Sequence, residues 1–157
     1  MKLSGMRVAI AGMAKSGLSV ARAVHDLGGC ATVLDQKPAD SLAIIEAMDA
    51  LHAMDVHAVP GWHGRLDPDE YDMLVVSPGF PREHPALADM AGKEVVGEIE
   101  FAYRIARDPI VAITGTNGKS TTTVLTWTLL RAAGKDAVLC GNIAGSGYPE
   151  VTLTEAA

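Results

Sequence analysis

Short apolar runs alternate with segments of helical periodicity through the first part of the chain. Residues 7–11 form a strand-like run, apolar residues recur at helical spacing from 16 to 27, and a second strand-like run covers 31–34. A strand, a helix and a strand within about thirty residues predict a βαβ unit, in which the crossover is right-handed and the strands are parallel.

The same alternation continues to residue 106. It predicts strands over 56–59, 73–76 and 95–96 and helices over 41–54, 85–90 and 98–106. The apolar stripes expected to face the core are Leu42, Ile45, Met48 and Leu51 in the first of these helices and Ile99, Ala102, Tyr103 and Ala106 in the last. Continuous apolar strands between helices are typical of a doubly wound α/β fold. We therefore predict a Rossmann-like domain with a parallel sheet over residues 1–97.

A second series of elements follows. It begins with an apolar run at 109–114, continues through a Gly-containing loop into a helix over 119–133, and includes a strand over 136–139. No further helix or strand is predicted up to residue 157. Because so small a unit buries too little surface for a stable core, we interpret residues 98–157 as the incomplete first part of a second α/β domain, and the chain as the front part of a longer polypeptide.

Charge and composition exclude several classes of function. Thirteen Lys and Arg residues against nineteen Asp and Glu residues give a net charge of −6, which argues against a general electrostatic interaction with nucleic acid. The apolar runs are far shorter than the roughly 20 residues of a membrane helix. The N-terminus also lacks the apolar stretch of a signal peptide. We expect a cytoplasmic protein that neither inserts into a membrane nor binds nucleic acid.

The strongest chemical signal lies between the apolar run at 109–114 and the helix that follows it. Its residues are Gly115, Thr116, Asn117, Gly118, Lys119, Ser120 and Thr121. Glycines let the backbone approach an anion, and the start of a helix presents amides and a dipole that favour phosphate. We predict a phosphate loop in which Lys119 reaches the terminal phosphates and the hydroxyl of Ser120 or Thr121 binds Mg²⁺. Ile113 stands where the strict eight-residue pattern has glycine, so the loop is either a shortened variant or a plain Gly-rich turn.

A weaker signal follows the first strand. Gly12 and Gly17 bracket a turn, and Asp35 ends the second strand, where a carboxylate could accept hydrogen bonds from a nucleotide. The arrangement resembles a dinucleotide-binding fingerprint with Ala14 in place of its middle glycine, which weakens a standard NAD site. A purely structural interpretation, in which the glycines allow a tight turn and close helix packing, stays open.

Two further turns occupy positions where open α/β sheets bind ligands. Ser77-Pro78-Gly79 follows the strand at 73–76, and Gly141-Asn142 follows the predicted strand at 136–139. Each could equally be a turn that only ends its strand. The histidines show no zinc-type spacing, and His84, close behind the first turn, is the one we consider for a ligand contact.

Together these motifs resemble the Mur ligase family. The matching positions are Gly17-Leu18-Ser19, Asp35, Ser77-Pro78-Gly79, His84-Pro85, Gly97-Glu98-Ile99-Glu100, the phosphate loop and Gly141-Asn142-Ile143. They run through the whole chain. Asn117 stands where the family's alanine-adding member has a histidine, so the resemblance favours the member that adds D-glutamate.

The resemblance implies a role for each domain. The first would bind the UDP part of UDP-MurNAc-L-alanine through Lys15, Ser16, Asp35, Gln36, Lys37, Ser77, Gly79 and Asn142. The second would be the incomplete N-terminal part of the family's central ATP-binding domain and would bind ATP and Mg²⁺ through the phosphate loop, with Lys119 as the catalytic residue. The implied activity is an ATP-dependent amide-bond ligase of peptidoglycan precursor synthesis, which adds D-glutamate through an acyl phosphate.

The resemblance also implies what this chain lacks. The family's Mg²⁺-binding glutamate, its second-site histidine, its carbamoylated lysine and its amino-acid-binding domain all lie beyond residue 157. We therefore expect a monomer that does not turn over by itself. The alternatives are a non-catalytic module that binds a UDP-sugar and an NAD-linked oxidoreductase built on the turn from Gly12 to Asp35.

Overall fold

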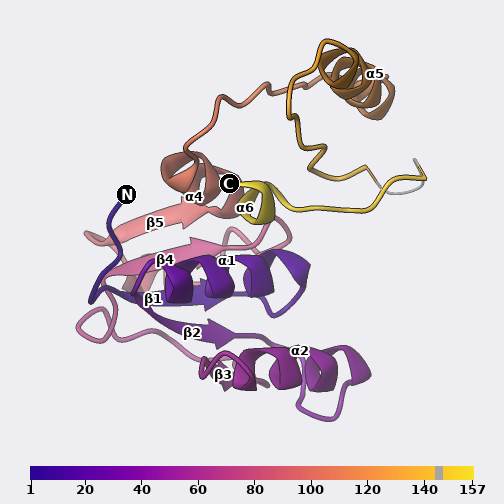
Figure 1. Ribbon diagram of the computed structural model, residues 1–157. Coiled ribbons are helices and arrows are strands. Elements are labelled where there is room, and N and C mark those ends of the chain that lie inside the picture. Colours follow the sequence, from indigo (N-terminus) through magenta and orange to yellow (C-terminus); the bar gives the residue numbers. More distant parts are fainter. Residues whose placement is uncertain (144–146) are drawn as a thin grey trace.

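The computed structural model describes residues 1–143 and 147–157, and within them the strands form one five-stranded parallel sheet in the order β3-β2-β1-β4-β5 (Figure 1). The strands are β1 (Arg7–Ala11), β2 (Cys30–Leu34), β3 (His57–Val59), β4 (Met73–Val76) and β5 (Glu94–Gly97). The helices are α1 (Lys15–Asp26), α2 (Leu42–His52), α3 (Pro85–Asp89), α4 (Glu98–Ile105), α5 (Lys119–Ala132) and α6 (Leu153–Ala156). The predicted α/β fold with a parallel sheet is confirmed.

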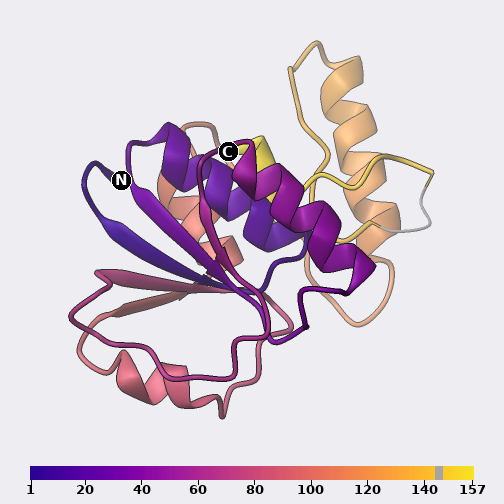
Figure 2. The ribbon, with the colours of Figure 1, turned by 90° about the horizontal axis from the view of Figure 1, so that it is seen from below.

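Helices cover both faces of the sheet (Figure 2). On one face, Val8 and Ile10 belong to a buried cluster with residues of α1, α2 and α4. On the other face, Ala9 and Ala11 share a smaller cluster with Ala86 of α3. The chain adds β2 and β3 on one side of β1 and then returns to add β4 and β5 on the other. Because crossovers are right-handed in both directions, this reversal places α3 on the face opposite to α1 and α2.

The elements up to residue 106 lie within two residues of their predicted bounds, and those of β1 and β4 are identical to the prediction. Phe101 of α4 is fully buried in the cluster that covers the sheet. In this structure α4 therefore packs on the first domain. The division of the chain at residue 97 stays a prediction.

The inward face of α2 differs from the prediction. Leu42 and Ile45 are exposed, and the buried residues of the helix are Ile44, Ala47 and Leu51. Apolar residues occupy both positions 44 and 45, so helical periodicity does not decide which of them faces the core. Contact with α1 and β3 selects the face that carries Ile44.

The inward face of α4 also differs from the prediction. Ile99 and Tyr103 are exposed, whereas Glu98, Phe101 and Ala102 are buried. A buried tyrosine requires a partner for its hydroxyl, and a phenylalanine does not. The apolar cluster over the sheet accordingly contains the phenyl ring of Phe101.

The strands predicted over 109–114 and 136–139 are wrong, because neither segment is a strand in the part of the chain that the structure describes. The helix between them is correct, since α5 covers Lys119–Ala132, but none of its residues is buried. In Figure 1, α5 stands apart from the sheet at the end of an extended segment. A strand is stabilised by backbone hydrogen bonds to a neighbour, and among the described residues neither segment has a strand beside it.

A short helix that was not predicted covers residues 153–156. α6 begins with a capping box, in which Thr152 Oγ1 accepts from the backbone N–H of Glu155 at 3.1 Å and the Glu155 carboxylate accepts from the N–H of Thr152 at 2.8 Å. The helix lies beside α4 and α1 (Figure 1). The Thr-x-x-Glu spacing was the available signal.

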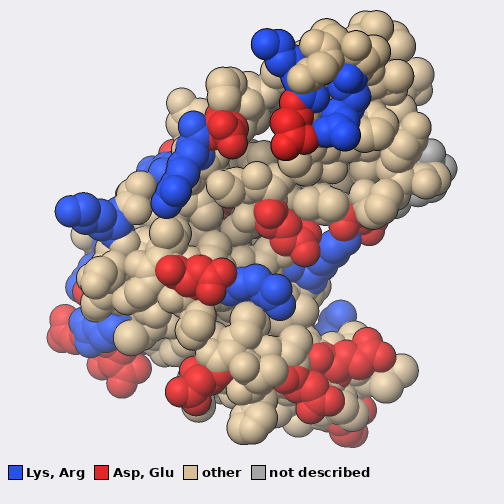
Figure 3. Space-filling model, in the orientation of Figure 1, with Lys and Arg blue, Asp and Glu red and all other residues tan. Residues whose placement is uncertain are grey.

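The surface carries charges of both signs. On the face shown in Figure 3, basic and acidic side chains are interspersed over the sheet domain and over α5. Large apolar side chains of α5 are exposed as well, including Leu125 and Leu129. A search of the described helices finds none that is long and apolar enough to cross a membrane.

Candidate functional site

The carboxyl ends of β1, β2 and β4 surround a hollow of about 140 Å³. Its lining residues are Ala11, Gly12, Asp35, Gln36, Trp62, Ser77, Gly79, Phe80 and Pro81. The hollow lies where the strand order reverses, the position at which open α/β sheets bind ligands. The structure thus brings Asp35, Gln36, Ser77 and Gly79, all predicted to contact the uridine nucleotide, to one place.

The two loops at the reversal approach each other closely. Gly12 adopts φ +110°, and a Cβ built on it would lie 2.6 Å from Ser77 Oγ. A Cβ on Gly17 would lie 1.8 Å from the carbonyl oxygen of Gly12. Side chains at positions 12 and 17 would therefore force the β1–α1 loop away from β4 and from its own helix. The structural role considered for these glycines is confirmed.

The carboxylate of Asp35 holds backbone amides of two loops. Its Oδ2 accepts from the N–H of Met13 at 2.7 Å, and its Oδ1 accepts from the N–H of Lys37 at 2.9 Å. Asp35 is followed by Gln36 and Lys37 in the turn after β2, and both of these side chains are exposed. Asp35 therefore fixes the loop after β1 against the turn after β2. A ligand in the hollow would meet a carboxylate whose oxygens already accept hydrogen bonds.

Aromatic rings form one side of the hollow. The ring of His84 contacts those of Trp62 and Phe80, with centroid distances of 4.8 Å to each. His84 Nδ1 accepts from the N–H of Ala86 at 3.2 Å and thereby caps α3, and the residue is buried. The histidine considered for a ligand contact supports two lining residues instead.

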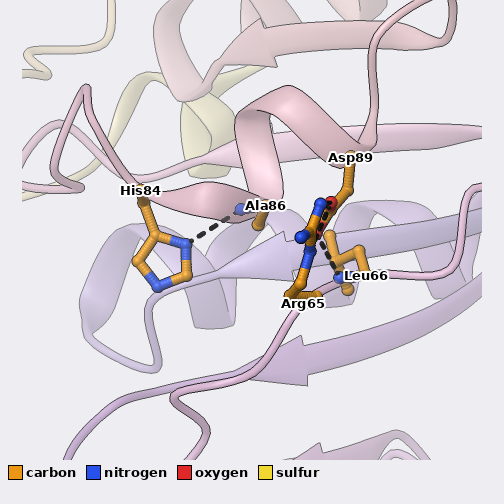
Figure 4. A network of polar contacts seen from close by, with 5 residues as sticks. All are labelled: Arg65, Leu66, His84, Ala86 and Asp89. Atoms are coloured by element: carbon orange, nitrogen blue, oxygen red, sulfur yellow. Dashed lines mark hydrogen bonds and ion pairs between the residues drawn. The ribbon is translucent and has the colours of Figure 1, made fainter.

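Figure 4 shows how both ends of α3 are fixed, at His84 and at Asp89. The Asp89 carboxylate accepts from Arg65 Nε at 2.8 Å and from the N–H of Leu66 at 2.9 Å. The side chain of Asp89 is only 5% exposed, although that of Arg65 is 75% exposed. Hydrogen bonds from Arg65 lower the pKa of the Asp89 carboxyl below its ordinary value. This network ties the segment that carries Trp62 to the helix that follows Phe80.

The remaining residues predicted for the uridine nucleotide lie outside the hollow. Lys15, the first residue of α1, donates from its ammonium to the carbonyl oxygen of Glu150. Ser16 is half-buried in the first turn of the same helix. Asn142 is exposed in a turn whose preceding residue, Gly141, donates from its N–H to the carbonyl of Val151 at 2.8 Å.

The predicted phosphate loop leads directly into α5. Gly118 is the N-cap of α5 with φ +77°, in the left-handed region that favours glycine. Lys119 Nζ donates to the carbonyl oxygens of Gly115 at 2.6 Å and Thr116 at 3.2 Å, so the ammonium lies over the loop. Thr116, Asn117, Ser120 and Thr121 are exposed. Amides of the first helical turn have no intrahelical acceptor and can bind an anion.

The residues of the loop fit Mg²⁺ only together with a phosphate ligand. Mg²⁺ is usually held by one or two protein oxygens plus phosphates and water, and the exposed hydroxyl of Ser120 is such an oxygen. In residues 1–143 and 147–157, no group of three or more His, Cys, Asp or Glu side chains could hold a metal by itself. The hydroxyl of Ser120 fits a magnesium ion whose other ligands are phosphates and water.

Sequence reasoning missed several residues of this region. Trp62 and Phe80 follow β3 and β4, so their positions after parallel strands were a usable signal. The pairing of Glu98 with Thr154, two buried polar residues 56 positions apart, had no signal in the sequence. It depends on α6 and on the packing of three helices.

Curated ligases match this chain over nearly its whole length. A UDP-N-acetylmuramoylalanine--D-glutamate ligase of Trichlorobacter lovleyi is 41% identical over 155 residues, which cover 98% of this chain and 34% of the relative. A ligase of the same name from Enterococcus hirae is 41% identical over 156 residues, which cover 96% and 33%. The chain thus spans about a third of the length of these relatives. No protein-family model matches the chain.

Solved structures agree on the fold. A murein peptide ligase from Psychrobacter arcticus aligns with a TM-score of 0.54 at 24% identity, over 83% of this chain and 27% of that one. A pseudomurein peptide ligase type C from Methanothermus fervidus aligns with a TM-score of 0.51 at 21% identity, with the same coverage. At these identities the likeness supports the arrangement of strands and helices and no more.

Proposed function

This chain belongs to the Mur ligase family, and on that premise we propose that it carries the uridine-nucleotide-binding domain and the phosphate loop of an ATP-dependent ligase, which adds D-glutamate to UDP-MurNAc-L-alanine. The reaction belongs to peptidoglycan precursor synthesis, and we place it in the cytoplasm, where its nucleotides are found. The relatives are named for this pair of substrates, and the chain shares about two-fifths of its residues with them.

The observation that carries the proposal is the hollow at the strand reversal. Gly12 and Ser77 meet there, and Asp35 fixes the amide of Met13 at its edge. Backbone amides at the end of the β1–α1 loop, after Met13, and at the start of α1 would bind the diphosphate of UDP, because amides of the first helical turn have no intrahelical acceptor and the helix dipole favours an anion. Gln36 and Gly79 would contact the nucleoside, and Lys15, Ser16, Lys37 and Asn142 would complete the site from its rim.

The phosphate loop would bind ATP. The exposed amides at the start of α5 and the ammonium of Lys119 would face the β- and γ-phosphates, and Lys119 would exchange the carbonyls of Gly115 and Thr116 for phosphate oxygens. The Ser120 hydroxyl would hold Mg²⁺, which supplies positive charge at the phosphates when bound.

The proposed chemistry has two steps. An oxygen of the terminal carboxylate of UDP-MurNAc-L-alanine attacks the γ-phosphorus of ATP, and ADP leaves. The amine of D-glutamate then attacks the acyl carbon, and phosphate leaves as the amide forms. A carboxylate is a poor electrophile, and the acyl phosphate supplies the leaving group. Lys119 would reduce the negative charge on the transferring phosphoryl group, which is the main contribution that a protein makes to this step.

Calorimetry on the 157-residue chain tests the proposal. We expect binding of UDP-MurNAc-L-alanine and, separately, of ATP with Mg²⁺. Lys119→Ala should abolish ATP binding and leave uridine-nucleotide binding unchanged, because Lys119 lies outside the hollow. The chain alone should release no ADP with both substrates present. Failure of the wild-type chain to bind any uridine nucleotide would contradict the proposed function.

A non-catalytic UDP-sugar-binding module is the second candidate. The sheet domain has a complete buried core, whereas no residue of α5 is buried and its phosphate loop is exposed. This contrast favours a chain that binds a uridine nucleotide without ATP. The same calorimetry separates the two, since only the ligase requires an ATP site that depends on Lys119.

A further inference from the structure

A buried carboxylate joins two helices that are far apart in the sequence. Glu98, the first residue of α4, is 6% exposed, and Thr154 of α6 is 5% exposed. Glu98 Oε1 accepts from Thr154 Oγ1 at 2.5 Å and from the N–H of Thr154 at 3.2 Å. A buried charge is costly unless it is hydrogen-bonded. Here the hydroxyl and the first-turn amide of Thr154 supply those hydrogen bonds.

The pair fixes α6 in place. α6 is a helix of four residues, too short to be stable by itself. Its capping box satisfies the start of the helix, and its contacts with α4 and α1 hold it on the sheet domain. The hydrogen bonds to Glu98 are the buried polar part of that contact. Without them, α6 would retain only its contact with α1 and α4 and the hydrogen bonds that the residues just before it accept.

The same segment is bonded to one residue predicted to bind the uridine nucleotide and to the chain neighbour of another. The carbonyl of Glu150 accepts from the ammonium of Lys15. The carbonyl of Val151 accepts from the N–H of Gly141 at 2.8 Å, next to Asn142. Residues 150–156 therefore connect the start of α1 with the turn at 141–142, and both connections depend on the position of α6.

We propose that Glu98 is a positioning residue for the uridine-nucleotide site, which acts through residues 150–156 on Lys15 and Asn142. This inference rests on the proposed function. Groups that are already in place bind a ligand without the loss of freedom that mobile groups incur. Loss of the contact between Glu98 and Thr154 would release residues 150–156 and, with this segment, the side chains of Lys15 and Asn142. The nucleotide would then have to order these two side chains, which would weaken its binding.

Amide exchange measured by mass spectrometry tests the docking step without any ligand. Glu98→Ala and Thr154→Val should each increase exchange in residues 139–143 and 150–156 and leave β1 and β4 protected. Glu98→Gln keeps an oxygen that accepts from Thr154, so it should restore much of the protection. Glu100→Ala is the matched control, because it removes an exposed carboxylate of the same helix whose partner is Arg104. Unchanged exchange in Glu98→Ala overturns the inference.

Calorimetry with UDP tests the positioning step. Glu98→Ala should weaken UDP binding about tenfold, which corresponds to the net contribution of roughly one hydrogen bond. Glu100→Ala should bind UDP as the wild type does. In a chain that already carries Lys15→Ala and Asn142→Ala, Glu98→Ala should have no additional effect, because the residues through which it acts are gone. An equal loss in both backgrounds would mean that Glu98 only stabilises the fold, and the positioning role would be wrong.

The outcomes separate this inference from the proposed function. If the wild-type chain binds UDP but Glu98→Ala binds it equally well despite faster exchange, the positioning role is overturned and the proposed function stands. If the wild-type chain binds no UDP, the proposed function fails, the positioning role fails with it, and the exchange data still decide whether Glu98 docks α6.

Discussion

Gly17→Ala is the most direct test of the loop that we place at the diphosphate. The new Cβ would lie 1.8 Å from the carbonyl oxygen of Gly12, and ordinary contact begins at 3.4 Å, so helix and loop must separate by 3.4 − 1.8 = 1.6 Å. Such a shift would disturb the contact between Gly12 and Ser77. Overpacking of this kind costs about 1–3 kcal/mol, a sizeable part of the roughly 5–15 kcal/mol that stabilises a domain.

Urea denaturation and calorimetry with UDP measure the two consequences. We expect the free energy of unfolding to fall by about 2–3 kcal/mol and UDP binding to become undetectable, because Gly12, which lines the hollow, and the first turn of α1 would be displaced. Gly97→Ala is the control, because its φ is −78° and a Cβ there meets nothing within 4 Å. As an N-cap it should lose at most about 1 kcal/mol. Stability and UDP affinity of Gly17→Ala equal to those of the control would refute the reasoning.

Three further predictions follow from single contacts. Phe101→Ala should cost about 3–5 kcal/mol in urea denaturation, whereas Tyr103→Ala, at a residue 65% exposed, should stay within about 0.5 kcal/mol of the wild type; equal losses would contradict the orientation of α4. Arg65 lowers the pKa of Asp89, so this pair stabilises the fold at pH values above the ordinary pKa of an aspartate carboxyl. The stabilisation is lost as the pH falls through the lowered pKa of Asp89. Asp89→Asn should therefore lower stability at pH 7 and flatten its decline on acidification, and an unchanged acid limb would contradict this. In a Trp127→Phe chain, Trp62 emission should change on addition of UDP, because Trp62 lines the hollow, and an unaltered spectrum at saturation would place the nucleotide elsewhere.

The sheet and its order of elements could be predicted because β1, β2 and β4 are short apolar runs with clear ends. Which face of α2 and which face of α4 is buried could not be predicted. Periodicity gives the spacing of apolar residues along a helix, but it does not decide which of two neighbouring apolar positions faces the core. In the structure Ile44 and Phe101 are buried, whereas Ile45 and Tyr103 are exposed. The strand predicted at 109–114 failed for another reason: an apolar run becomes a strand only where a second strand offers hydrogen bonds.

The candidate site, too, could be predicted only in part from the sequence. Ser77 and Gly79 could be predicted from the rule that ligands bind at the carboxyl ends of parallel strands. The hydrogen bonds of Asp35 to the amides of Met13 and Lys37 could not be predicted, since they depend on how two loops meet. The contact between Trp62 and His84 depends on α3 and on the Asp89 network, which no local pattern in the sequence indicates.

The two proposed nucleotide sites differ in how far the fold prepares them, and this difference predicts their relative affinities in the 157-residue chain. The hollow is built on buried strands, and hydrogen bonds to Asp35 and Asp89 fix its loops. The phosphate loop stands on α5, which has no buried residue and no sheet beneath it in the described part of the chain. Fixing a loop and helix that no core holds in place opposes binding, so UDP should bind more tightly than ATP. Calorimetry with both nucleotides measures the difference. An ATP affinity equal to or above that for UDP would mean that α5 holds its loop in place without a core, and the contrast drawn between the two sites would be wrong.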